Sequence, residues 1–126
     1  SLDPIKTIVT EIKRQFPEIP IIVFPRAVNT IYSDFSDIKM FDVLAVDQFV
    51  DRKWLANNIQ PKKIIQGNLD PLFLTQKPEI LLSELKKVTE DFKNFPYVFN
   101  LGHGITPDAK VENVSLVVDY VKGLKF

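Results

Sequence analysis

Short apolar runs alternate with helix-forming patterns along this chain, and this alternation restricts the fold more than any other feature of the sequence. The apolar runs predict strands at residues 21–24, 41–46, 63–65 and 97–99. Apolar residues at helical spacing and flanking signals predict helices at 2–16, 28–38, 51–57, 78–92 and 110–121. Since strands that alternate with helices form right-handed βαβ units, we expect a parallel sheet in an α/β fold.

The first strand and the helix before it carry the clearest predictions about packing. The run Ile21-Ile22-Val23-Phe24 has no polar residue, which predicts a strand buried on both faces. The preceding helix is predicted from apolar residues at helical spacing, which are Leu2, Ile5, Ile8, Val9, Ile12 and Phe16.

Four strand–helix units are compatible with two architectures. One is a small open α/β sheet, and the other is half of a (β/α)8 barrel, which spans about 250 residues when complete. The chain has 126 residues and no linker or low-complexity segment, so we expect a single domain. It begins with Ser1 rather than methionine, which indicates either processing or a piece of a longer protein. Composition does not distinguish the two architectures.

Composition narrows the classes of function. Sixteen basic residues balance sixteen acidic ones, which argues against a nucleic-acid-binding or membrane-surface protein. The chain has no cysteine and one histidine, so thiolate chemistry and a zinc site of the usual kind are not expected. No run of eighteen apolar residues and no signal peptide is found, and we expect a soluble, cytoplasmic protein.

Polar residues follow each predicted strand. Because the carboxyl ends of parallel strands share one edge, and ligands bind at that edge in α/β folds, these residues are the candidate site. They are Arg26 after the first strand, Asp47 after the second, Gln66 and Asn68 at the third, and Asn100 and His103 after the fourth.

Each candidate also has a simpler structural explanation. His103 lies between Gly102 and Gly104, which suits a site residue that binds anions or transfers protons, although a hydrogen-bonded structural histidine is the alternative. Asp47 either caps the next helix or faces a ligand, and Arg26 is either a surface charge or a carboxylate clamp. The segment 66–71 has turn chemistry throughout, to which a ligand role would be additional.

Other features predict no chemistry of their own. The Gly-x-Gly around the histidine lacks the third glycine of a dinucleotide fingerprint. Trp54 is expected to pack in its short helix, and Lys86 and Lys87 are expected on a solvated helix face. No acidic cluster has the spacing of a metal site.

Two motifs resemble the uroporphyrinogen decarboxylase family. They are Gln66-Gly67-Asn68-Leu69-Asp70-Pro71, after a short apolar strand, and Asn100-Leu101-Gly102-His103-Gly104-Ile105 further along. Val46-Asp47-Gln48 is similar to that family's segment with a strand-end aspartate, and Pro107 and the last helix continue the likeness. The resemblance covers essentially all 126 residues.

The resemblance implies that residues 1–126 are a single partial domain, the C-terminal half of a (β/α)8 barrel with four βα units after one helix. The implied activity removes the four acetate carboxylates of uroporphyrinogen to give coproporphyrinogen in porphyrin and haem synthesis, without metal or organic cofactor. A pyrrole protonated at carbon accepts the electrons of the departing carboxylate. The enzyme must therefore supply an acid, an anion that steadies the ring, and donors for the other carboxylates.

The resemblance also implies roles for single residues. His103 matches the family's cleft histidine, for which we expect substrate orientation or carboxylate binding, and the other five strand-end residues are expected on the same substrate-binding edge. The family's arginine, aspartate, tyrosine and serine lie upstream of this chain. No catalytic residue is therefore assigned within it, and we expect it to be inactive alone.

One loop departs from the family pattern. The family often has a lysine followed by glycines after the first of these strands, whereas Phe24-Pro25-Arg26-Ala27-Val28 has no glycine, so the loop must differ. Related barrels that are zinc-dependent methyltransferases use cysteine ligands, and the absence of cysteine disfavours that reading. The alternative function is a half-barrel that binds a ligand or partner. Its exposed strand edges should make it pair with itself or with the missing half.

Overall fold

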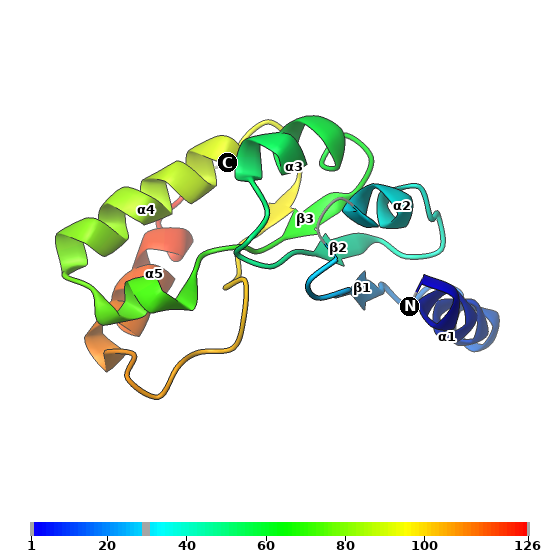
Figure 1. Ribbon diagram of the computed structural model, residues 1–126, viewed down its shortest axis with the longest axis horizontal. Coiled ribbons are helices and arrows are strands. Elements are labelled where there is room, and N and C mark those ends of the chain that lie inside the picture. Colours follow the sequence, from blue (N-terminus) through cyan, green and yellow to red (C-terminus); the bar gives the residue numbers. More distant parts are fainter. Residues whose placement is uncertain (1, 29–30, 126) are drawn as a thin grey trace.

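The computed structural model describes residues 2–28 and 31–125 and contains one four-stranded parallel sheet (Figure 1). The strands lie side by side in chain order, at Ile22–Val23 (β1), Val43–Ala45 (β2), Ile64–Gln66 (β3) and Tyr97–Val98 (β4). The register aligns Val23 with Leu44, Leu44 with Ile65, and Ile65 with Tyr97. The predicted parallel α/β sheet is therefore confirmed, with strands shorter than the apolar runs.

The helices follow the predicted order. They are α1 (Leu2–Gln15), α2 (Tyr32–Ser36), α3 (Arg52–Asn58), α4 (Pro78–Asp91) and α5 (Val111–Lys122), with a 3-10 helix, η2 (Pro71–Thr75), between β3 and α4. The helix predicted at 28–38 is reduced to α2, and residues 29–30 of that range lie outside the described residues. The helix η2 was not predicted, although Asp70 caps it by accepting from the Leu72 backbone N–H.

The core lies on one face of the sheet. Val23, Leu44 and Ile65 share that face, and all three are buried in a cluster with side chains from the helices. The buried helix residues include Phe35 from α2, Leu55 from α3, Leu81, Leu85 and Val88 from α4, and Val117 from α5. Figure 1 shows α3, α4 and α5 gathered on the same part of the molecule.

The other face of the sheet is open at its outer strands, whereas Val43 and Ala45 of β2 are buried there. Ile22 is 52% exposed, Phe24 45% and Val98 41%, and Ile22 and Val98 belong to the outer strands. The prediction that the first strand is buried on both faces is therefore wrong for this chain. Val23 is buried, whereas Ile22 and Phe24 on the opposite face are exposed.

Helix α1 also has apolar side chains that remain exposed. The predicted helix is confirmed, and within its apolar set Val9 is buried whereas Ile8 and Phe16 are exposed. Within the part of the chain that the structure describes, no helix has the length and apolar character needed to cross a membrane.

Candidate functional site

The carboxyl edge of the sheet is extended beyond its last strands. Leu69 and Leu101 form a parallel bridge past the ends of β3 and β4. The Leu69 N–H donates to the Asn100 carbonyl over 3.2 Å, and the Gly102 N–H donates to the Leu69 carbonyl over 2.8 Å. Consequently the two motifs 66–71 and 100–105 run side by side, and the loop after β3 holds Gly102, the residue next to His103.

Asp47 lies at the centre of this edge and is only 1% exposed. Its Oδ2 accepts hydrogen bonds from the Ala27 backbone N–H and the Tyr32 hydroxyl, both at 2.9 Å, and its Oδ1 accepts from the Phe49 N–H at 3.0 Å. Three donors on two oxygens are the compensation that a buried carboxylate requires. Asp47 therefore joins the loop after β1 to the loop after β2. It does not cap α3, because Asp51 fills that role by accepting from Trp54 N.

Tyr32 completes the Asp47 cluster, and the sequence did not single it out. Its hydroxyl donates to Asp47 Oδ2 and accepts from the Asp47 N–H at 3.2 Å. Burial is the main cause that raises the pKa of the Tyr32 phenol, and the neighbouring carboxylate adds to it. Tyr32 is therefore a neutral donor at ordinary pH. A tyrosine at the start of a short helix gives no sequence signal for this role.

The structure of the loop after β1 shows how this chain accommodates the absence of glycine in residues 24–28. Ala27 has φ of +60°, a left-handed conformation in which glycine is usually found. Its N–H is the one held by Asp47 Oδ2. The loop therefore takes up the backbone shape that a glycine would favour, and a buried carboxylate holds it there.

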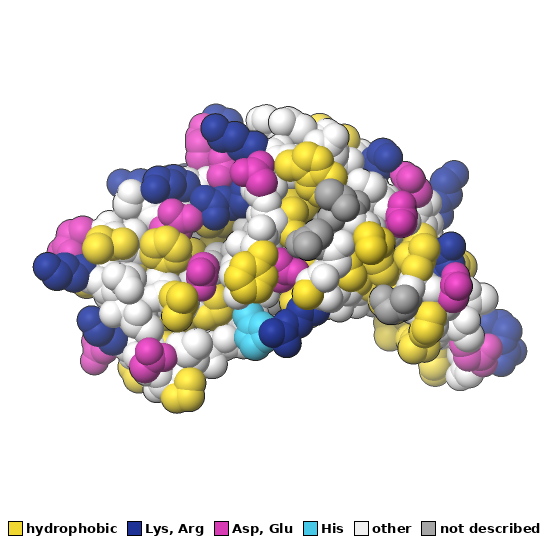
Figure 2. Space-filling model, in the orientation of Figure 1, with side chains coloured by type: hydrophobic (Ala, Val, Ile, Leu, Met, Phe, Trp, Pro, Cys, Tyr) yellow, Lys and Arg dark blue, Asp and Glu magenta, His cyan; other side chains and the backbone are white. Residues whose placement is uncertain are grey.

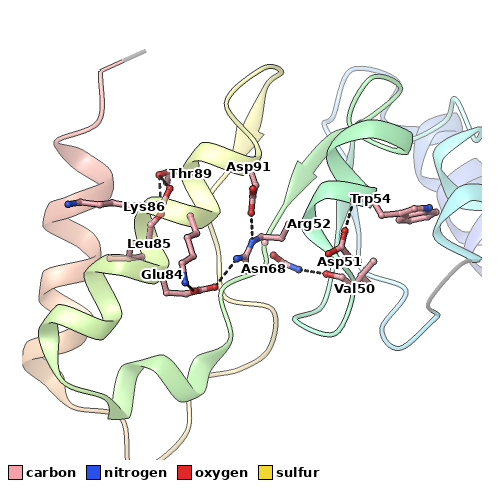
Figure 3. Close-up of polar contacts among 12 residues, drawn as sticks. Val50, Asp51, Arg52, Trp54, Asn68, Glu84, Leu85, Lys86, Thr89 and Asp91 are labelled. Atoms are coloured by element: carbon pink, nitrogen blue, oxygen red, sulfur yellow. Dashed lines mark hydrogen bonds and ion pairs between the residues drawn. The ribbon is translucent and has the colours of Figure 1, made fainter.

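Asn68 is 2% exposed and links the ends of β2 and β3. Its Nδ2 donates to the Asp47 carbonyl at 2.8 Å and to the Val50 carbonyl at 3.3 Å (Figure 3 shows the contact with Val50). Its Oδ1 is buried without a hydrogen-bond partner among the described residues. The Asn68 side chain thus holds the loop between β2 and α3 in place.

His103 and Arg26 are two of the three exposed members of the predicted set, and Asn100 is the third. The imidazole lies at the surface, as Figure 2 shows for the single histidine, and its Nδ1 is 3.4 Å from the Gly104 carbonyl. Among residues 2–28 and 31–125, Arg26 forms no ion pair. These two side chains are therefore available to an anionic ligand at the edge that carries the buried cluster.

Gln66 and Asn100 complete the predicted set. Gln66 ends β3 and is half-buried, and its carbonyl accepts from the Val46 N–H at 2.9 Å. Asn100 is exposed, and its Oδ1 accepts from the Leu101 N–H at 2.9 Å. All six predicted residues thus lie along one connected edge, with two buried beneath it and four reaching its surface.

A second polar cluster braces the helices behind this edge (Figure 3). Arg52 at the start of α3 donates from Nε to Asp91 and from Nη2 to Glu84, both at 2.8 Å and both on α4. These charges are mostly buried, so the attraction is less screened than in a surface pair. The brace fixes α3, and with it the loop that carries Gln48 and Phe49.

The arrangement suits binding of carboxylates better than metal chemistry. Within the described residues, no group of three or more histidine, aspartate or glutamate side chains is placed to hold a metal ion. The Asp47 carboxylate already has its donors, while neither Arg26 nor His103 forms an ion pair with an acid in the part of the chain that the structure describes. Arginine and protonated histidine form the strong, charge-assisted hydrogen bonds that carboxylate ligands accept.

Comparison with known proteins identifies relatives over nearly the whole chain. The family model described as Uroporphyrinogen decarboxylase (URO-D) matches residues 1–124. Curated proteins named uroporphyrinogen decarboxylase are 43% identical over 122 residues in Jannaschia sp. and 40% identical over 121 residues in Rickettsia africae. These alignments cover 97% and 96% of this chain but 36% and 35% of the relatives. The chain therefore spans little more than a third of the length of the curated relatives it matches.

Proposed function

This chain belongs to the uroporphyrinogen decarboxylase family, and we propose that it supplies the carboxylate-binding wall of a decarboxylase active site. The observation that carries the proposal is the connected carboxyl edge, where His103 and Arg26 are exposed above a buried Asp47–Asn68 cluster. A substrate with several carboxylates needs cations and hydrogen-bond donors at fixed positions, and a saturated buried cluster provides a rigid base for them.

Residues 1–126 form, in this proposal, a single partial domain that is the C-terminal half of a (β/α)8 barrel. Support comes from the parallel strand order and from the open apolar face that includes Ile22, Phe24 and Val98. In a closed barrel such side chains fill the interior, and strands from the remaining units pair with the two outer strands. The relatives are almost three times as long as the aligned region, which leaves ample length for four further units.

The six edge residues divide into two groups in this proposal. His103 and Arg26 bind substrate carboxylates, and Gln66 and Asn100 add polar contacts nearer the sheet. Asp47 and Asn68 act from behind, because their side chains are buried and engaged with the neighbouring loops. No metal or organic cofactor takes part.

The proposed chemistry converts each acetate side chain to a methyl group. A pyrrole carbon is protonated, the carbon–carboxylate bond breaks, and its electron pair flows into the ring as carbon dioxide leaves. Protonation of the exocyclic carbon and loss of the ring proton then restore the pyrrole, so each cycle consumes one proton and releases one carbon dioxide. The acid and the anion that steady the ring belong to the upstream part of the protein, so this chain alone is inactive.

The test compares three preparations for conversion of uroporphyrinogen to coproporphyrinogen: this chain alone, the protein including its upstream part, and that longer protein with His103→Ala or Arg26→Ala. We expect no activity from the chain alone, full activity from the longer protein, and a raised KM in both variants. Turnover by the chain alone would contradict the partial-site assignment. An inactive, folded longer protein would overturn the proposed reaction, and variants with unchanged KM would remove the two residues from the carboxylate-binding wall.

The open apolar face favours a second candidate, a half-barrel that binds a ligand or pairs with another copy of itself. Exposed strand edges and apolar patches promote such pairing. Sedimentation of this chain separates the cases: a dimer that persists after the upstream part is added supports the module, whereas replacement of the dimer by a one-to-one complex supports the barrel. We further propose that the protein is cytoplasmic, and recovery in a membrane or exported fraction would contradict that.

A further inference from the structure

The two glycines beside His103 lie in opposite surroundings. At Gly102 an added Cβ would be 2.4 Å from the Gln48 backbone nitrogen and 2.9 Å from its Cα, much closer than atoms can approach. At Gly104 an added Cβ would have no heavy atom within 4 Å apart from those of its chain neighbours. Only the first glycine is therefore required for packing, and what it packs against is the backbone of the loop between β2 and α3.

That loop cannot easily retreat, because it is held at both ends of the contact. Asn68 Nδ2 bonds to the carbonyls of Asp47 and Val50, which bracket Gln48 in the sequence. The N–H of Phe49, the residue after Gln48, bonds to Asp47 Oδ1 at 3.0 Å. Gln48 therefore presents a rigid backbone surface to the glycine.

On its own side, Gly102 is fixed by the hydrogen bond from its N–H to the Leu69 carbonyl at 2.8 Å. Leu69 directly follows Asn68. The third strand's loop thus holds the second loop through the Asn68 side chain and the fourth loop through the Leu69 carbonyl. This contact between three loops therefore fixes the position of the neighbouring His103.

We propose that Gly102 and Asn68 are positioning residues that set the location of His103 over the site, with the Gln48 backbone as the stop. This inference rests on the proposed function for the role of His103, but not for the contact itself. An alanine at 102 must move from 2.4 Å to at least the ordinary contact distance of 3.4 Å, so the loops must separate by about 1 Å.

The first experiment reads the position of the imidazole directly. Because the chain has a single histidine, its ring signals in NMR spectra belong to His103 without assignment. Gly102→Ala and the matched control Gly104→Ala place the same methyl group on either side of that ring. We expect the first to shift and broaden the imidazole signals and the second to leave them nearly unchanged, with unaltered circular dichroism in both. Equal effects of the two variants would overturn the proposal.

Asn68→Ala keeps the test decisive if Gly102→Ala does not fold, since it releases the Gln48 loop without adding bulk. It should broaden the imidazole signals although Asn68 and His103 belong to different loops. Unchanged imidazole signals in a folded Asn68→Ala protein would equally overturn the proposal.

The second experiment measures KM and kcat in the protein that includes the upstream part. Gly102→Ala should raise KM by about tenfold or more while kcat falls less, because the displaced group binds the substrate; Gly104→Ala should leave KM within about twofold. If Gly102→Ala moves the imidazole and leaves KM unchanged, the positioning contact stands and the proposed carboxylate role of His103 fails. The two hypotheses are thereby tested separately.

Discussion

Removal of one hydroxyl group tests whether the Asp47 cluster is the structural base of the carboxyl edge. In Tyr32→Phe the ring stays in the core, but the hydroxyl that donates to Asp47 Oδ2 and accepts from the Asp47 N–H is lost. Oδ2 keeps the Ala27 N–H as a donor, and Oδ1 keeps the Phe49 N–H. The variant therefore leaves a buried carboxylate with two donors and a buried backbone N–H without its acceptor.

The expected cost follows from these two losses. A hydrogen bond to a charged group contributes roughly 1.5–3 kcal/mol, and a buried donor without a partner costs roughly 1–3 kcal/mol. The losses overlap because they share one hydroxyl, so we expect the free energy of unfolding to fall by about 3 kcal/mol. That is a large share of the roughly 5–15 kcal/mol by which domains are stable.

Urea unfolding followed by circular dichroism and by the fluorescence of Trp54 measures this change. The matched control is Tyr120→Phe, which removes the same atom from a half-buried ring whose hydroxyl lies 3.1 Å from Thr89 Oγ1. No carboxylate depends on that contact, and we expect a loss of about 0.5–1 kcal/mol there. If the two variants lose equal stability, Asp47 does not depend on Tyr32, and the cluster is not the base of the edge.

Three further predictions concern other parts of the chain. Ala27→Gly should raise the free energy of unfolding by about 0.5 kcal/mol, as measured by urea titration. Glycine relieves the left-handed strain (about 1–2 kcal/mol), and this gain exceeds the cost of the greater entropy of the unfolded chain. Destabilisation would contradict this. Arg52→Ala should cost about 3 kcal/mol, because it leaves the mostly buried Asp91 without its ion-pair partner and Glu84 with only Lys87 at 3.5 Å. Lys62→Ala at an exposed pair should cost under about 0.5 kcal/mol, and similar costs would refute the difference. Burial raises the pKa of Tyr32 and Tyr97, so the folded state holds protons that the unfolded chain releases at about pH 10. Stability should therefore fall as pH rises above about 10, and absorbance at 295 nm should show these phenols ionising only with unfolding; their ionisation in the folded protein would contradict it.

The features of the fold that depend on local pattern were predictable from sequence. Alternation of apolar runs and helical spacing placed all four strands and the main helices, and the carboxyl ends of those strands gathered the six candidate residues. Burial was less predictable, because it depends on what covers an element. Ile22 and Phe24 have the pattern of a doubly buried strand, yet their face is open in this chain.

The cluster beneath the site could not be predicted, because most of its contacts join residues 15 to 21 positions apart. Nothing local marks Tyr32 as the partner of Asp47, and the two glycines beside His103 look equivalent in sequence. Only the approach of Gln48 distinguishes Gly102 from Gly104. Local propensity also misleads at Ala27, where a residue that prefers a helix takes a left-handed conformation.

The altered loop after β1 shows which part of the edge can vary. Where the family often has glycines, this chain has Ala27, and the Asp47 carboxylate offsets the backbone strain by accepting the Ala27 N–H. The same carboxylate accepts from the loop after β2 and from α2, so its position is set by three segments at once. A change in any one segment leaves the other two contacts in place. A buried, multiply bonded carboxylate therefore lets the exposed residues of the loop, Arg26 among them, change in sequence without moving the base on which His103 is positioned.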